Sequence, residues 1–98
     1  MASGVEIGTL IERDPAIRNG RPKIAGTGLT VRRVVGWYKM GMSPDEIARE
    51  YPHLTLAQVH AALAYYHANV EEIESDIAQE QQAAAHWERQ LAGDLKRG

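Results

Sequence analysis

Three histidines have the spacing that comes nearest to a metal site in this 98-residue chain. His53, His60 and His67 follow one another at intervals of seven residues. Side chains seven residues apart on a helix lie about 10 Å from each other along its axis, which is too far for one ion to contact both imidazoles. Helical zinc sites place two histidines four residues apart and add a third ligand. We therefore expect no bound metal.

Acidic residues offer a second type of chemistry, general acid–base catalysis. Glu71, Glu72, Glu74 and Asp76 lie close together, but they open a strongly polar segment and are typical of a solvated helix face. The turn at residues 26–28 lacks the lysine of a phosphate-binding loop. The sequence contains no cysteine, which excludes disulfides, thiol catalysis and thiolate metal sites. These observations predict a binding protein without a cofactor, and not an enzyme.

Basic residues predict contact with an anionic partner. Residues 1–42 carry seven Lys or Arg and three Asp or Glu, a net charge of +4, whereas residues 43–98 carry four and ten, a net charge of −6. A basic segment favours binding to phosphate or to an acidic protein surface. The alternative is that these residues are ordinary surface cations. Those that we expect to contact DNA are Arg18, Arg21, Lys23, Arg32 and Arg33.

Helix signals are strongest in the middle of the chain. Ser43 and Glu46 have the spacing of a capping box, and Pro44 follows at the first helical position, which predicts a short helix over residues 44–51. After a break at Pro52, Thr55 opens a second helix that ends near residue 69. A short helix, a tight turn and a second helix form a helix-turn-helix. In the DNA-binding form of this motif the second helix enters the major groove, so we expect Thr55 and Gln58 to contact DNA there.

Irregular structure is predicted before this motif. Residues 1–8 are expected to form a flexible terminus, and residues 9–13 a short strand. Turn signals around residues 19–28 separate two β-compatible runs, Lys23–Ala25 and Leu29–Val31, which predict a small hairpin. A first helix then begins after Thr30 and ends at Gly41.

A long helix is predicted from residue 70 to the end of the chain. Its sparse apolar residues follow alternating steps of three and four when Glu80 is counted as a polar position; they are Val70, Ile73, Ile77, Ala84, Trp87 and Leu91. This spacing is typical of a helix that packs along another helix. We expect Ile73, Ile77, Trp87 and Leu91 to bind a second copy of the chain or another protein. The alternative is that the helix folds back on the protein's own core.

Several ordered motifs resemble the DUF433 family of bacterial proteins. They are the I-x-x-D-P that begins at Ile11, followed by NGRPKIAGTGLTV, GMSPDEIAREYP and LTLAQVHAALAYY, and together they span more than half of the chain. Members commonly carry a basic residue after the second hairpin glycine, where this sequence has Gly26-Thr27-Gly28. The resemblance implies a homeodomain-like helix-turn-helix fold and an antitoxin role beside a toxin with a PIN-type ribonuclease fold. The segment after Val70 lies outside the shared pattern.

The elements and the resemblance together predict a mainly α fold. A homeodomain-like helix-turn-helix core with a small N-terminal β-hairpin occupies residues 9–69, and residues 70–98 form a helical extension for dimer or partner binding. The first residues lack the pattern of a secretory signal, and no apolar run is long enough to span a membrane. We therefore expect a cytoplasmic protein that does not contact the membrane.

The leading functional prediction is an antitoxin-like DNA-binding regulator. It would form a homodimer, bind operator DNA and pair with a PIN-type ribonuclease toxin, whose acidic cleft Arg89, Lys96 and Arg97 would neutralise. Residues 55–69 contain no Lys or Arg, which weighs against simple DNA binding because phosphate neutralisation dominates DNA affinity. The alternative is a protein–protein interaction module that uses the helix-turn-helix only as a packing motif.

Overall fold

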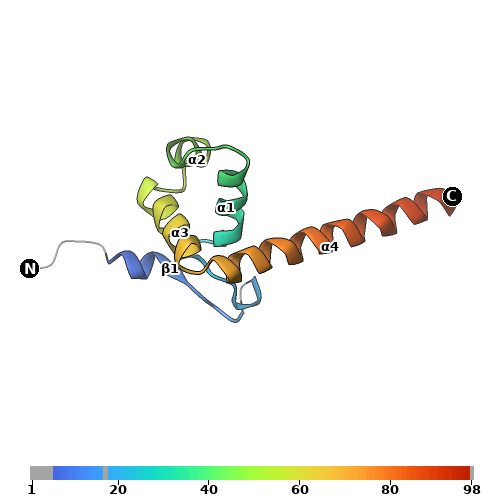
Figure 1. The fold of residues 1–98 in the computed structure, drawn as a ribbon, viewed down its shortest axis with the longest axis horizontal. Helices are drawn as coiled ribbons and strands as arrows, with labels where there is room; N and C mark the ends of the chain where they lie inside the picture. Colours follow the sequence, from blue (N-terminus) through green and yellow to red (C-terminus); the bar gives the residue numbers. More distant parts are fainter. Residues whose placement is uncertain (1–5, 17, 98) are drawn as a thin grey trace, which may run out of the picture.

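The fold is mainly helical, with one long helix that projects from a small core (Figure 1). The structure, a computed structural model, describes residues 6–16 and 18–97. Its elements are the 3-10 helices η1 (Ile7–Leu10) and η2 (Arg18–Gly20), the strands β1 (Ile11–Glu12) and β2 (Lys23–Ile24), and the helices α1 (Val31–Lys39), α2 (Pro44–Glu50), α3 (Leu56–Ala68) and α4 (Val70–Arg97). The predicted fold class is confirmed. No helix in the described ranges is long and apolar enough to cross a membrane.

Both helices of the helix-turn-helix begin with the predicted caps. Ser43 Oγ accepts a hydrogen bond from the Glu46 backbone N–H at 3.2 Å, and the Glu46 carboxylate accepts one from the Ser43 N–H at 3.1 Å. Thr55 and Gln58 form the same reciprocal pair at the start of α3, at 3.1 and 2.8 Å. Each box satisfies two backbone donors, one at the cap residue and one in the first turn of the helix.

The first helix and the helix-turn-helix enclose one apolar core. Its buried members are Ile24, Val31, Val34, Val35, Ile47, Leu54, Val59, Ala62, Leu63 and Ile73. Ile47 from α2 and Val59 from α3 are fully buried where the two helices cross. Apolar side chains of α2 and α3 therefore belong to the same core.

The first turns of α4 belong to this core. Ile73 is fully buried, and Ile77 is half-buried against the same cluster. The prediction that Ile73 contacts a partner is therefore wrong, because its side chain is already packed inside its own chain. The alternative, that the helix folds back on the core, describes the first part of α4, whereas the rest of α4 extends the molecule to 66 Å (Figure 1).

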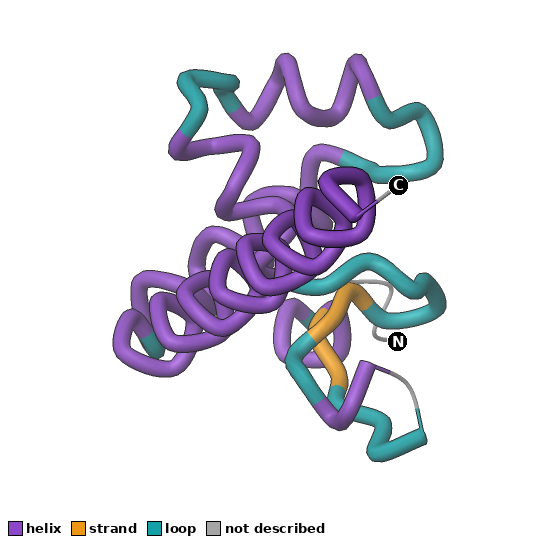
Figure 2. The backbone as a smooth tube through the Cα atoms, turned by 90° about the vertical axis from the view of Figure 1, so that its right-hand side faces the viewer, coloured by secondary structure: helices purple, strands orange, loops and turns teal. Residues whose placement is uncertain are grey.

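The N-terminal region pairs differently from the predicted hairpin. Strand β2 pairs antiparallel with β1, with Ile11 opposite Ile24 and Glu12 opposite Lys23. A single bridge, between Lys23 and Thr30, joins β2 to the expected second arm at residues 29–31. The second arm stays this short because α1 already begins at Val31. The strand predicted within residues 9–13 is thus the true partner of β2 (Figure 2).

The predicted flexible terminus covers two kinds of residue. Residues 1–5 lie outside the described part of the chain. Residues 7–10 form η1, which the Thr9 hydroxyl stabilises by donating a hydrogen bond to the Glu6 carbonyl at 2.6 Å. The last two residues of the predicted terminus therefore begin a regular turn.

The burial of Ile73 predicts that truncation of this side chain lowers the stability of the fold. The substitution Ile73→Ala should lower the free energy of unfolding by about 2–5 kcal/mol, since it removes buried methyl groups and leaves a cavity. The matched substitution Ile7→Ala, at a side chain that is 69% exposed, should change it by less than about 0.5 kcal/mol. Urea denaturation followed by circular dichroism measures both values. Equal losses in the two variants would contradict the packing of α4 on the core.

Candidate functional site

The cations predicted to contact DNA differ in what already surrounds them. Arg21 faces α4, where its Nε lies 3.3 Å from Asp76 Oδ1 and its Nη2 donates to Gln79 Oε1 at 2.6 Å. The side chain of Arg18 lies outside the described set, so its predicted contact with DNA stays a prediction. Arg21 is therefore already held by an acidic residue and an amide of its own chain.

Lys23 is buried. Its side chain is 3% exposed, and its ammonium donates hydrogen bonds to the Glu12 carboxylate and, at 2.8 Å, to the Thr27 carbonyl. The bond from Lys23 lowers the pKa of Glu12 below its usual value, which favours the ionised carboxylate. A lysine in these contacts cannot reach a phosphate, so the prediction that Lys23 binds DNA is wrong. Its role is to join β1 to the turn that follows β2.

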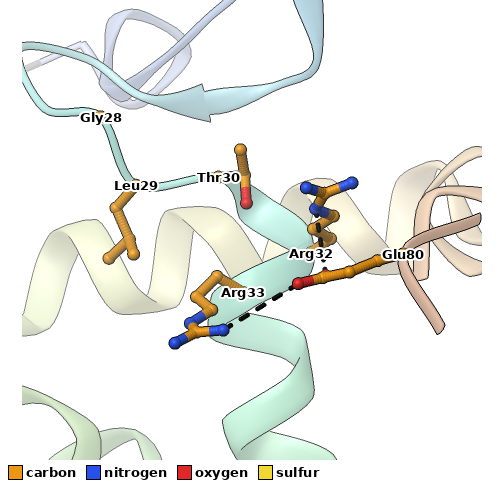
Figure 3. Close-up of a pocket in the computed structure, with 6 residues that line it drawn as sticks. All are labelled: Gly28, Leu29, Thr30, Arg32, Arg33 and Glu80. Carbon is orange, nitrogen blue, oxygen red and sulfur yellow. Dashed lines mark ion pairs between the residues drawn. The ribbon is translucent and has the colours of Figure 1, made fainter. Parts of the chain in front are cut away.

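Arg32 and Arg33 open α1 and share one carboxylate. Glu80 reaches from α4 between them, 3.2 Å from Arg32 Nε and 4.0 Å from Arg33 Nη1, beside a hollow that Gly28, Leu29 and Thr30 also line (Figure 3). The Arg32 side chain is 18% exposed, whereas that of Arg33 is 58% exposed. One carboxylate cannot neutralise two guanidinium groups, so this cluster keeps a net positive charge at Arg33.

An aromatic stack sets the direction of Arg33. Its guanidinium lies 5.6 Å from the centre of the Trp37 ring, and Trp37 stacks on Tyr51 at 4.0 Å with an angle of 13° between the rings. Cation–π contact and ring stacking thus join α1 to the residue that ends α2. Sequence reasoning missed this stack, because Trp37 and Tyr51 are separated by 14 positions and belong to different elements.

Two tyrosine networks fix the direction in which α4 leaves the core. The Tyr65 hydroxyl donates to Glu72 Oε1 at 2.7 Å, and Arg13 donates to both of these side chains. The bond from Arg13 lowers the pKa of Glu72, and the bond to Glu72 raises the pKa of Arg13. The tyrosine, the carboxylate and the arginine therefore tie the end of α3 and the N-terminal strand to the start of α4.

The neighbouring Tyr66 repeats this arrangement with different partners. Its hydroxyl donates to Glu74 Oε2 at 2.5 Å, and Lys39 Nζ donates to Glu74 Oε1 at 2.7 Å. The Lys39 bond lowers the pKa of Glu74, and the bond to Glu74 raises the pKa of Tyr66. Sequence reasoning treated the acids of this segment as a solvated face. The signal that could have identified the pairing is the opposite charge of the two halves of the chain.

The start of α3 has the position of a recognition helix but not its charge. Thr55 is exposed and Gln58 is half-buried, and both already serve the capping box. Figure 1 shows this end of α3 beside α2, away from the start of α4 where Arg21 and Arg32 have their acidic partners. Arg21 and Arg32 therefore face α4, whereas the predicted base contacts lie at the start of α3.

The distal half of α4, residues 81–93, carries two large apolar side chains that are exposed. Trp87 is 66% exposed and Leu91 is 60% exposed. Figure 1 shows this segment extending away from the core, and Figure 2 looks toward its end. The side chains of residues 94–97 lie outside the described set. Among the described residues, no three ligand-type side chains lie close enough to hold a metal ion.

Comparison with known proteins places the chain in a family. A family model described as protein of unknown function (DUF433) matches residues 11–66, which is more than half of the chain. The chain belongs to the DUF433 family. A crystal structure of a DUF433 member protein from Anabaena variabilis ATCC 29413 is similar, with a TM-score of 0.67 and 31% sequence identity over 71% of this chain and 69% of that chain. No curated protein matches significantly.

The family match covers only part of this DUF433 protein. It covers β1, α1, α2 and nearly all of α3, and it ends before α4 begins. The caps and the buried side chains of the helix-turn-helix thus lie inside the shared region. The tyrosine networks join that region to a helix outside the match.

The Tyr65 network predicts a pH-dependent contribution to the stability of this DUF433 protein. Because the folded state lowers the pKa of Glu72, its carboxylate stabilises the fold above the ordinary pKa of a glutamate, and this contribution is lost as the pH falls through the lowered pKa. Glu72→Gln should therefore destabilise the protein at neutral pH, by about 1 kcal/mol or less for a partly exposed pair, and have little effect in acid. Urea denaturation across this pH range measures the difference.

A double-mutant cycle provides the control for this prediction. In an Arg13→Gln background, Glu72→Gln should lose most of its pH-dependent effect, since Arg13 is the main cause of the lowered pKa. An undiminished effect in that background would assign the stabilisation to another partner.

Proposed function

We propose that this DUF433 protein is an antitoxin-like protein-binding module whose binding element is the distal half of α4. The observation that carries this proposal is the exposure of Trp87 and Leu91, at 66% and 60%, on a helix that has left the core. Protein interfaces bury tryptophan near their centre, because one such side chain removes a large apolar area from water. A partner that covers this segment removes that area from water.

Two faces of the distal half differ in chemistry. A helix turns by about 100° per residue, so Arg89 lies about 200° around the axis from Trp87. Trp87 and Leu91 share the apolar face, and the exposed Arg89 lies on the other. The family resemblance supplies a PIN-type ribonuclease as the candidate partner, and its acidic cleft complements Arg89. Lys96 and Arg97 follow in the sequence and add to the positive charge of this end.

Protein binding is favoured over DNA binding by the state of the cations. Lys23 is buried, and Arg21 and Arg32 already face carboxylates of α4. DNA binding gains most of its affinity from cations that are free to replace counterions on phosphates. The helix-turn-helix is then chiefly the frame that holds α4 in place.

The test is to express a tagged chain from its native chromosomal context and to identify the proteins that copurify with it. A tagged full-length chain should retain a PIN-type ribonuclease after nuclease treatment, identified by mass spectrometry. Arg89→Glu should reduce its recovery at least tenfold, because it places a negative charge against an acidic cleft. Leu56→Ser, at an apolar side chain of α3 that is 42% exposed, is the control and should leave recovery unchanged. Full recovery with Arg89→Glu would contradict the proposal.

Operator DNA is a second candidate partner, and one observation favours it. Arg33 remains 58% exposed and shares the Glu80 carboxylate with Arg32. If these arginines grip phosphates, Glu80→Gln should free them and tighten binding to a duplex from the protein's own promoter. The slope of log affinity against log salt should then become steeper by about 0.9 for each additional phosphate that the protein neutralises. Fluorescence anisotropy at several salt concentrations measures this slope, and identical slopes for both proteins would count against DNA binding.

A further inference from the structure

We propose that the apolar face of the distal half of α4 binds the same face of a second copy of this chain, with the two helices antiparallel. This inference rests on the proposed function, since it names a partner for the same segment. It concerns the face that carries Trp87 and leaves the opposite face, with Arg89, free for another protein.

The face in question continues one that is already buried. Ile73 is fully buried and Ile77 is half-buried against the core, and Ala84, Trp87 and Leu91 follow them at the same alternating steps of three and four. A straight helix rotates by only about 20° per heptad relative to such a pattern, so these side chains share one face. The core covers the first part of this face and leaves the second part exposed. A heptad pattern that continues beyond the core of the same chain is typical of a helix that pairs with another helix.

The position of the core decides the direction of pairing. The core packs on the N-terminal part of this face and gathers around that end of α4, while the distal half extends away from it (Figure 1). In a parallel pair, the cores of both copies would occupy the same space beside the helices. In an antiparallel pair, the two cores lie at opposite ends, and the distal halves meet between them.

The small and large residues of this face suggest a register. When Ala84 of each copy faces Trp87 of the other, the indole packs over a residue that leaves room for it. The same register brings Leu91 of the second copy opposite Glu80, at the edge of a groove between α1 and α4 that Gly36, Trp37, Met40 and Ile77 help to line. Met40 is 78% exposed at this groove. The second copy would therefore cover apolar surface on α1 as well as on α4.

The charge of the distal half favours a second copy over a highly charged partner at this face. Residues 81–93 contain one acid, Glu88, and one cation among Lys and Arg, Arg89, whereas residues 70–80 contain five acids. Two distal halves can therefore approach without net repulsion. Two proximal halves cannot, and they are kept apart in the antiparallel arrangement.

The oligomeric state of the full-length chain tests the pairing. Sedimentation analysis over a range of concentrations should show a monomer–dimer equilibrium, and Trp87→Ser should weaken the dimer at least tenfold. Circular dichroism should show unchanged helicity in this variant, since Trp87 lies outside the core cluster. A chain that remains monomeric at all concentrations, or a dimer unaffected by Trp87→Ser, would overturn the proposal.

Crosslinking tests the direction and the face, because the chain contains no cysteine of its own. With a short bismaleimide, Ala84→Cys should give a covalent dimer. Gln82→Cys, on the opposite side of the helix, should not. Leu91→Cys should not give a covalent dimer, since residue 91 of one copy lies opposite residue 91 of the other only in a parallel pair. A covalent dimer from Leu91→Cys would overturn the antiparallel arrangement.

The ribonuclease capture experiment separates this inference from the proposed function. A monomeric chain whose capture of the ribonuclease depends on Arg89 would refute the second copy and leave the proposed function standing. A dimer that captures no ribonuclease would support the second copy and refute the antitoxin role.

Discussion

The acidic residues of α4 meet the cations of the N-terminal half of the chain, and much of the molecule depends on this contact. Glu72 and Glu74 bind Arg13 and Lys39 directly and also accept hydrogen bonds from the two tyrosines of α3, while Asp76 and Glu80 face arginines farther along. The Arg13–Glu72 and Lys39–Glu74 pairs are partly exposed, and a single ion pair of this kind contributes little to stability. Their shared effect is geometric, because several contacts on different sides of one helix allow it only one direction.

Ile73 provides the apolar part of the same contact. Its burial among the side chains of the helix-turn-helix anchors α4, and the ion pairs around it orient the helix about that anchor. The long helix is therefore a rigid continuation of the core for its first turns. The projection of Trp87 and Leu91 into solvent follows from this rigidity, since α4 is a continuous helix from Val70 to Arg97.

The same contact changes what the helix-turn-helix can offer to DNA. A recognition helix works with cations that grip the phosphates on either side of the groove. Here three of the cations predicted for that task are occupied within the chain, and α3 itself has no Lys or Arg. The fold has the frame of a helix-turn-helix, and its charged side chains hold α4 against that frame. This is why the proposed binding element lies on α4, outside the region that matches the family.

The sequence by itself determined the features whose physical cause is local. The capping boxes at Ser43 and Thr55 set the starts of α2 and α3, because cap and partner lie three residues apart in one helical turn. The motifs between residues 11 and 66 identified the family for the same reason, since they are contiguous in the chain. Tertiary structure decided which charges pair and which apolar residues are free. Arg13 and Glu72 are 59 positions apart, and periodicity alone could not show that Ile73 is buried while Trp87, on the same face, is exposed. Pairing and burial at that separation depend on how the core positions α4, and no local pattern encodes that position.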